Sequence, residues 1–257
     1  MTTTTAQARM TPKRISTMNR KLFALARDNA GRGSGIRSEA SGDSATIYIY
    51  DVIDAYWGVS AADVAAELSK ITAKNLTVRI NTPGGDVFEA RAIMTLLVEH
   101  PAKITAKIDG VAASAGSVIA LAAETVEIAD GGFYMIHKGW TFVMGNADDL
   151  RTTAGLLDKI DASLIADYVA KTGKDAAEIE TLMKAETWFS AEEAVAAGFV
   201  DAIMPTTAAK AKANARAFNL AIYDKAPQAL TEPEPEPDDS VRERMLARLG
   251  LYERTAA

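Results

Sequence analysis

The hydrophobic residues of this chain follow two different patterns. Runs such as Thr46–Tyr50 and Leu76–Asn81 are rich in β-branched and aromatic residues, whereas in residues 60–71 and 87–99 the apolar side chains recur every three or four positions. The first pattern is typical of strands and the second of amphipathic helices. Because the two alternate over residues 44–204, the sequence predicts an α/β domain with a mostly parallel sheet and helices on both faces.

The expected elements can be placed along the chain from these patterns and from capping residues. We expect strands at Thr46–Tyr50, Leu76–Asn81, Lys103–Asp109, Thr125–Ala129, Phe133–His137 and Phe199–Ile203. We expect helices after the cap residue Ser60, from the turn at Thr82–Gly85 to Glu99, and over Ser114–Ala123, Ala147–Thr172, Asp175–Ala185 and Ser190–Gly198. Gly173 is the expected C-terminal cap of the longest helix, and Ser190 opens a capping box.

Neither end of the chain shows a sustained apolar period. Residues 1–43 contain no acidic residue before Asp28, and they predict a disordered basic arm, with a propeptide, a partner-binding arm or a transit peptide as the other interpretations. Residues 205–257 predict a linker, acidic and proline-rich at 231–239, followed by a short amphipathic helix at Val241–Tyr252 that either docks or is disordered.

Composition excludes several classes of function. There are no cysteines and two histidines, which removes disulfides and thiolate chemistry and disfavours a metal site. The formal net charge of −6 disfavours nucleic acid as the main ligand. No apolar run reaches the roughly 18 residues that span a bilayer. We therefore expect no membrane span and no metal or organic cofactor, and the absence of disulfides fits a cytoplasmic location.

Ser114 is the first candidate for chemistry. It stands among small residues where an apolar strand turns into an apolar helix, a position from which a hydroxyl can reach a substrate. The alternative is a small residue that lets the helix pack closely on the sheet. Ser117, one turn later, is the competing nucleophile, but it is expected inside the helix.

A serine nucleophile needs a base, and the chain offers His100 and His137. His100 precedes a proline at a helix end and reads as structural, so His137, at the end of a strand, is the better candidate. Glu186, just before a capped helix, is our choice for the group that holds the imidazole, the alternative being a solvated carboxylate.

The turn Thr82-Pro-Gly-Gly85 is the third feature. It is either an ordinary strand-to-helix turn or a place where backbone amides approach a ligand. Combined with Ser114, the amides of Gly85 and Ala115 would supply the two donors that acyl transfer requires for its oxyanion.

Four motifs follow one another in a fixed order: Arg79-Ile-Asn-Thr-Pro-Gly-Gly-Asp-Val87, Asp109-Gly-Val-Ala-Ala-Ser-Ala-Gly-Ser-Val-Ile119, Met135-Ile-His137, and Glu186-Thr-Trp-Phe-Ser-Ala-Glu-Glu-Ala-Val195 with Gly198-Phe-Val-Asp201. In these motifs, the span from about Thr46 to Ile203 resembles the Clp protease proteolytic subunit family, and more closely its phage and prophage branch of head maturation proteases. Asp201, near the end of the span, reads as structural.

The resemblance implies a serine-type endopeptidase with Ser114 as nucleophile, His137 as base and the Gly85 and Ala115 amides as oxyanion donors. The acid in the best-studied members is aspartate, and this chain has Glu186 at that position. The implied fold is the ClpP/crotonase-like spiral of repeated β-β-α units, with a helical handle and flexible N- and C-terminal tails. Family members form stacked homo-oligomeric rings, whose contacts would come from the loop and long helix after His137.

The resemblance leaves the biological setting open. The favoured expectation is phage head maturation, with capsid or scaffold protein as substrate in the host cytoplasm or prohead. The alternative is a housekeeping proteolytic subunit to which an ATP-dependent AAA+ unfoldase feeds protein. A crotonase-like acyl-CoA enzyme, which would use carboxylates in place of the Ser–His pair, and an inactive assembly module are the remaining alternatives.

Overall fold

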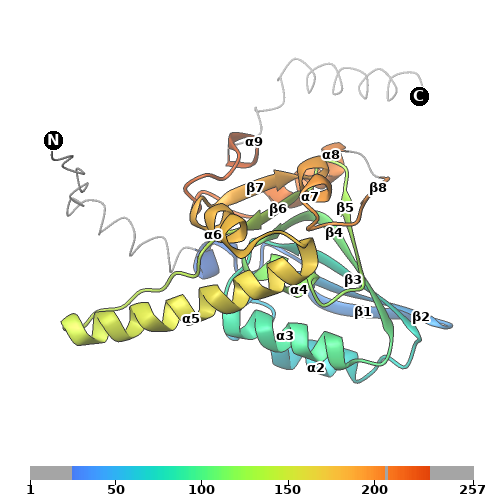
Figure 1. Cartoon of the computed structure of the whole chain (residues 1–257). Helices are drawn as coiled ribbons and strands as arrows, with labels where there is room; N and C mark the ends of the chain where they lie inside the picture. The colour runs from blue at the N-terminus through green and yellow to red at the C-terminus, as the bar shows by residue number, and fades with distance from the viewer. Residues whose placement is uncertain (1–24, 206–207, 232–257) are drawn as a thin grey trace, which may run out of the picture.

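A mostly parallel sheet of eight strands forms the centre of the part of the chain that the structure describes (Figure 1). The structure is a computed structural model and describes residues 25–205 and 208–231. Its strands are β1 (Gly35–Ser41), β2 (Ser44–Tyr50), β3 (Asn75–Thr82), β4 (Lys103–Ala113), β5 (Thr125–Ala129), β6 (Phe133–Ile136), β7 (Thr187–Ser190) and β8 (Ala202–Met204). The main order is β1-β2-β3-β4-β5-β8, while β6 pairs with β4 and β7 pairs with β6.

The central strand β4 changes partner halfway along its length. Residues 105–108 pair in parallel with β5, and residues 111–113 pair in parallel with β6. The strand therefore turns away from β5 after Asp109 and ends beside β6. The pairs β1–β2 and β6–β7 are antiparallel, and the remaining pairs are parallel.

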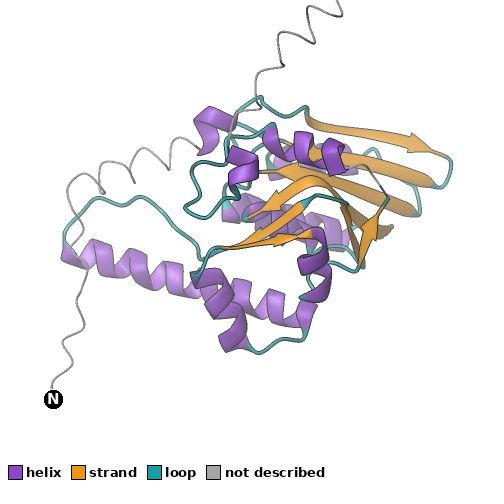
Figure 2. Ribbon diagram, turned by 90° about the horizontal axis from the view of Figure 1, so that it is seen from above, coloured by secondary structure: helices purple, strands orange, loops and turns teal. Residues whose placement is uncertain are grey.

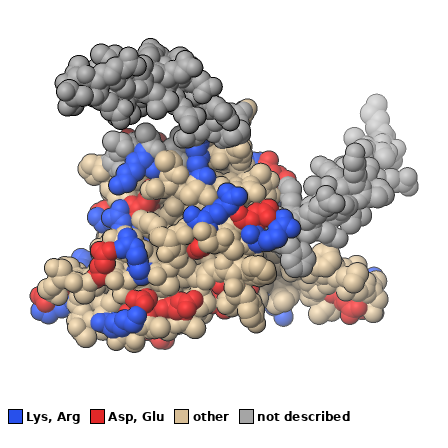
Figure 3. Space-filling model, turned by 180° about the vertical axis from the view of Figure 1, so that it is seen from behind, with Lys and Arg blue, Asp and Glu red and all other residues tan. Residues whose placement is uncertain are grey.

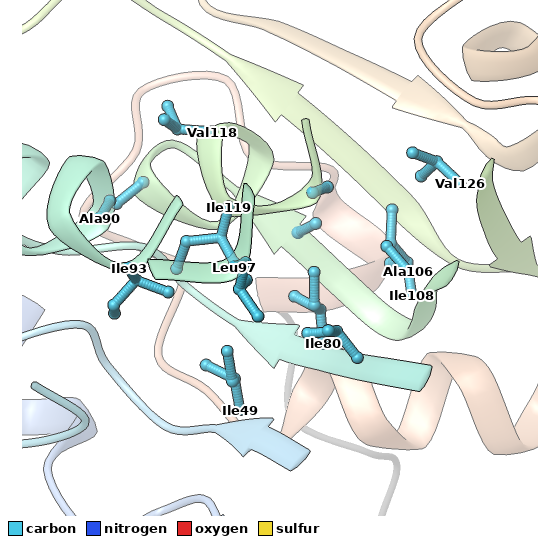
Figure 4. Close-up of a cluster of buried hydrophobic side chains, with 14 of the residues drawn as sticks. Ile49, Ile80, Ala90, Ile93, Leu97, Ala106, Ile108, Val118, Ile119 and Val126 are labelled. Carbon is cyan, nitrogen blue, oxygen red and sulfur yellow. The ribbon is translucent and has the colours of Figure 1, made fainter. Parts of the chain in front are cut away.

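The two faces of the sheet are covered by different parts of the chain. The helices are α2 (Ala61–Leu68), α3 (Val87–Glu99), α4 (Ala115–Ala120), α5 (Ala147–Thr172), α6 (Ala176–Lys184), α7 (Ala191–Ala196), α8 (Ala208–Arg216) and α9 (Gln228–Thr231). Figure 4 shows the larger core, in which Ile93 and Leu97 of α3 and Ile119 of α4 pack near Ile80 and Ile108 of the sheet. In the two ribbon views the first half of α5 projects beyond the sheet (Figures 1 and 2).

A second, smaller core lies on the opposite face of β4 and β6. Val111 and Ala113 belong to it, whereas Ala112, between them in the strand, belongs to the larger core. Because neighbouring strand residues point to opposite faces, this alternation shows that both faces are buried. The covering residues come from the segment after β8, with Phe218 and Leu220 almost completely buried.

This second core packs residues from outside the expected domain of 44–204 against it. Within the arm expected to be disordered up to residue 43, residues 25–29 are helical and β1 pairs along its whole length with β2. The buried amide of Asn29 exchanges hydrogen bonds with the backbone of Asn219, with Asn29 Nδ2 to Asn219 O at 3.1 Å and Asn219 N to Asn29 Oδ1 at 2.6 Å. The packed unit thus includes residues on both sides of the expected domain.

The region expected to be only a linker is likewise folded over its described part. Helix α8 packs on β4, and the chain continues through buried residues as far as α9. The tails expected to be flexible lie outside the described residues. They comprise residues 1–24, most of the acidic proline-rich segment and the expected helix at Val241–Tyr252.

Local capping explains why the expected helices form where they do. Ser60, Asn146 and Ser190 each make a capping box at a helix start, and Gly173 ends α5 in the left-handed conformation. The expected strand at Phe199–Ile203 is wrong in its first half. Phe199 and Val200 are buried, but their amides bind Ala194 O at the end of α7, so the strand begins at Ala202.

Charged residues pair with one another across the surface, and Figure 3 shows basic and acidic side chains intermingled on one face. The most enclosed ion pair of the described residues joins Arg79 of β3 to Asp109 of β4, where Tyr50 of β2 also donates to the carboxylate. Within the described residues, no helix is both long and apolar enough to cross a membrane, and no group of three or more acidic, histidine or cysteine residues is placed to hold a metal.

Candidate active site

Ser114 occupies a strained position between β4 and α4. Its backbone has a φ of 53° and a ψ of −117°, values that non-glycine residues rarely adopt. The Ser114 amide donates to Met135 O at 3.0 Å, which fixes the turn against β6. Backbone strain of this kind typically costs about 1–3 kcal/mol and persists only where the surrounding structure enforces it. The conformation places the hydroxyl at the end of the sheet.

His137 follows β6 and meets this hydroxyl. Because Ala113 of β4 pairs with Met135 of β6, the residues just beyond the two strand ends lie close together. Ser114 Oγ is 2.7 Å from His137 Nε2, although 23 positions separate the two residues. Burial disfavours the charged imidazolium and lowers the pKa of His137 to about 4. The histidine is therefore neutral near pH 7 and able to accept a proton.

The turn Pro83-Gly84-Gly85 lies beside Ser114 and requires both glycines. A Cβ at Gly84 would come within 2.7 Å of Ala113 O, and one at Gly85 would come within 2.0 Å of Ile53 O. Both glycines also have positive φ, at 97° and 149°. The turn can therefore approach Ser114 only because these side chains are absent.

Two backbone amides beside Ser114 have no hydrogen-bond acceptor in the part of the chain that the structure describes. The N–H groups of Gly85 and Ala115 donate to none of the described residues, whereas the neighbouring amides of Gly84 and Ser114 are bonded. Gly85, Ala115, Ser114 and His137 all line one cavity of about 590 Å³. The expected oxyanion donors are thus brought together with the Ser–His pair.

The remainder of this cavity is mainly apolar. Its walls include Val118 of α4, Leu157 and Ile160 of α5, and the aromatic rings of Phe88 and Trp140. It can accept a large apolar side chain beside the serine hydroxyl, because burying such a side chain is favourable.

The competing candidates have structural partners. Ser117 Oγ donates to Ser114 O at 2.6 Å and lies 2.7 Å from Tyr168 Oη, in a fully buried position. His100 binds the backbone through both ring nitrogens, at Ile71 O and Ala102 N. Asp201 accepts from the Val126 amide and from Lys171. These contacts agree with the structural roles expected for His100 and Asp201.

Glu186 is not brought to His137. Its carboxylate accepts from the amides of Lys225 at 2.6 Å and Asp224 at 3.1 Å, and from Trp188 Nε1 at 3.3 Å. The backbone of Glu186 has a φ of 49°. Among the described residues, Ser114 is the hydrogen-bond partner of the His137 ring. The structure therefore lacks the histidine–carboxylate contact that was expected here.

Tyr223 also lies at this site, and the sequence patterns did not indicate it. Its ring lies edge-on to the His137 ring, with centroids 5.6 Å apart, and its hydroxyl donates to Pro83 O at 2.5 Å. Tyr223 belongs to the segment that was expected to be a linker. The alternation of apolar residues at Phe218, Leu220 and Ile222 was the available signal that this segment is packed.

Comparison with known proteins decides the family. The family model described as Clp protease matches residues 43–207, more than half of the chain. The chain belongs to the Clp protease family. It is therefore a Clp-type serine peptidase, and the crotonase-like and non-enzymatic alternatives are set aside.

The curated relatives of this Clp-family chain carry consistent names. It is 31% identical over 170 residues to ATP-dependent Clp protease proteolytic subunit 1 of Protochlamydia amoebophila, covering 63% of this chain and 81% of the relative. It is 29% identical over 154 residues to the ATP-dependent Clp protease proteolytic subunit of Streptococcus suis, covering 53% of this chain and 72% of the relative. These names give the expected phage head maturation branch no support.

A solved Clp structure confirms the fold. The described core is similar to a ClpP1 mutant from Listeria monocytogenes, with a TM-score of 0.56 and 23% sequence identity, covering 63% of this chain and 91% of that one. The expected α/β ClpP-like architecture is therefore confirmed, with its mostly parallel sheet.

Proposed function

We propose that this Clp-family chain hydrolyses peptide bonds with Ser114 as nucleophile and His137 as general base. The observation that supports it most strongly is the 2.7 Å contact between Ser114 Oγ and His137 Nε2 at a strained strand-to-helix turn. A neutral imidazole in this position can remove the hydroxyl proton as the oxygen attacks a carbonyl carbon.

The reaction would proceed in two symmetrical halves. His137 takes the proton of Ser114 as the acyl-enzyme bond forms, and it then protonates the leaving amine of the cleaved peptide. A water molecule repeats the attack, with His137 again as base, and releases the acid product and the free hydroxyl. The residues of this chain supply every proton transfer in this sequence.

The amides of Gly85 and Ala115 are proposed to stabilise the oxyanion of the tetrahedral intermediate. Both are without a described acceptor and line the cavity that contains the serine. Loss of one such donor typically costs about 2.7–4 kcal/mol of transition-state stabilisation. The Pro83–Gly85 turn would therefore be a catalytic part of the fold as well as a connection between β3 and α3.

The substrate class follows from the cavity and from the relatives. The apolar walls around Ser114 favour polypeptides with a large apolar side chain next to the scissile bond. The relatives named above are proteolytic subunits of ATP-dependent Clp proteases. We therefore favour a subunit that receives unfolded protein from an ATP-driven partner, in preference to the capsid and scaffold substrates expected from the motifs alone.

We also propose that the protein forms a homo-oligomeric ring, because apolar side chains are exposed on and before α5. Leu150 and Leu156 on α5 and Phe142 and Met144 in the loop before it are all exposed in the single chain. A second copy packed against this projecting helix would bury them, in line with the ring contacts expected of the loop and helix after His137. Light scattering of the full chain measures the assembly directly, and a monomer at all concentrations would contradict a ring.

The activity and the setting are tested with two substrates. We expect the protein to hydrolyse a short fluorogenic peptide with an apolar residue before the scissile bond, and Ser114→Ala to abolish this. A stably folded protein should be degraded only when a Clp unfoldase and ATP are added. Cleavage of a folded protein without them would contradict the unfoldase-dependent setting and restore the capsid interpretation.

A further inference from the structure

The segment after α8 connects two parts of the active site through one buried side chain. The ring of Tyr223 packs edge-on against His137 at an interplanar angle of 85°, and its hydroxyl donates to Pro83 O at 2.5 Å. His137 is the proposed base, and Pro83 begins the turn that holds the Gly85 amide. A single residue therefore contacts both the base and the support of one oxyanion donor.

We propose that Tyr223 is a positioning residue that fixes His137 relative to the Pro83–Gly85 turn, and that Glu186 anchors Tyr223 by binding the turn at residues 224–225. This inference rests on the proposed function, because it assigns Tyr223 and Glu186 to the same reaction. Neither residue is assigned a direct contact with the substrate.

The contacts of Glu186 support the anchoring role. Its two carboxylate oxygens accept the amides of Asp224 and Lys225, which directly follow Tyr223 in the chain. Trp188 donates to the same carboxylate and packs its ring against Tyr223, with centroids 5.6 Å apart. A carboxylate that accepts backbone amides is a strong local anchor. Glu186 therefore acts on the base through Tyr223.

The fit around the tyrosine hydroxyl is close. A Cβ on Gly84 would lie 3.2 Å from Tyr223 Oη, so the turn and the tyrosine occupy adjacent space without room for a side chain between them. Tyr223 is 5% exposed. The hydroxyl can therefore hold the turn, while the ring shields one side of the imidazole from water.

The pKa of His137 reports this shielding, because the charged groups near the imidazole are paired with other partners. The Ser114 hydroxyl and the Tyr223 phenol contact the imidazole. Lys138, the next residue, pairs with Glu180 and Asp161, and Glu186 binds the amides at residues 224–225. Burial is what lowers the pKa of His137. Removing the Tyr223 ring should therefore raise this pKa, whereas removing only its hydroxyl should not.

The test compares Tyr223→Phe, Tyr223→Ala and Glu186→Gln in the full-length protein, using kcat and KM for a fluorogenic peptide from pH 3.5 to 8.5. Tyr223→Phe should lower kcat about tenfold, because the lost hydroxyl no longer holds the Pro83–Gly85 turn and its oxyanion donor. KM should stay within twofold of the parental value, and the acid limb of kcat/KM should not move. Tyr223→Ala should lower kcat further and move the acid limb upward from about 4 toward the ordinary histidine value of about 6.5.

Glu186→Gln separates anchoring from a triad role. A glutamine retains one oxygen acceptor for the amides at 224–225, so we expect kcat to fall no more than about tenfold. Loss of the histidine-orienting carboxylate of a Ser-His-acid triad costs about 10⁴-fold in kcat. Tyr48→Phe and Glu178→Gln are the matched controls, because Tyr48 and Glu178 contact exposed charged groups away from this cavity.

Several outcomes would overturn the inference. A loss of kcat near 10⁴-fold in Glu186→Gln would show that Glu186 is a triad acid. Parental kcat and pH profiles in both Tyr223 variants would show that Tyr223 has no positioning role. If Tyr223→Ala does not fold, Tyr223→Phe and the pH profile of the unmutated protein still test the inference. A half-maximal kcat/KM at pH 6.5 in the unmutated protein would contradict a shielded His137. A parent that hydrolyses no peptide refutes the proposed function instead.

Discussion

The carboxylate of Glu186 accepts the amide of Lys225 at 2.6 Å, across 39 positions of the chain. This contact joins the start of β7 to the segment that covers His137, and it occupies the carboxylate that the family resemblance would place on the imidazole. The arrangement leaves the base half-buried and neutral, with Ser114 as its hydrogen-bond partner among the described residues.

The first prediction concerns pH. The base is active when neutral, and burial lowers the pKa of His137 to about 4. As pH falls, kcat/KM should therefore remain level through pH 6 and decrease only near pH 4, since the acid limb reports the base of the free enzyme. A pH profile on a peptide substrate, with circular dichroism to confirm folding at each pH, measures this limb. A half-maximal point at or above 6.5 would show that a carboxylate or water stabilises the imidazolium.

The second prediction concerns the Pro83–Gly85 turn. In Gly85→Ala the new Cβ would meet Ile53 O at 2.0 Å, and the φ of 149° is unfavourable for alanine. The Gly85 amide must then move, so we expect kcat to fall about 10²- to 10³-fold, as for the loss of one oxyanion donor.

Gly155→Ala in α5 is the control for this substitution, because nothing lies within 4 Å of its Cβ position. It should keep parental kcat and gain roughly 0.5–1 kcal/mol of stability as a helix-interior glycine is replaced. Equal activity of the two variants would show that the turn does not serve the reaction.

The third prediction concerns the second core. Phe218 is 2% exposed and packs in the cluster with Val111 and Met135 of the sheet. Phe218→Ala should lower the free energy of unfolding by about 3–5 kcal/mol, as for other large core deletions. Urea denaturation measures the change. Phe88→Ala, at a side chain that is 61% exposed, should change stability by less than about 0.5 kcal/mol. A small effect at Phe218 would mean that the segment after β8 is not part of the folded unit.

The sequence predicted the elements whose signals are local. Helix α5 has the expected bounds of 147–172, with the Asn146 capping box at its start and Gly173 at its end. Strand β5 also has its expected limits. Ser114 and His137 could be paired because a serine nucleophile needs a base and because the motifs around both residues resemble those of one protease family.

The features that were missed depend on contacts between distant segments. Strand β1 is a largely exposed edge strand, so its sequence lacks a buried face that would have identified it. Helix α8 buries the small residues Ala211 and Ala215, which give a weak hydrophobic pattern. The position of the Glu186 side chain is fixed by the backbone of residues 224–225, and no local pattern around Glu186 indicates that partner.

The most direct test of the central claim is labelling of the full-length protein with a fluorophosphonate probe, followed by peptide mapping. We predict one modified residue, Ser114, with labelling lost in Ser114→Ala and strongly reduced in His137→Ala, and retained in Ser117→Ala. Modification of another serine, or undiminished labelling of Ser114 without His137, would contradict the proposed catalytic pair.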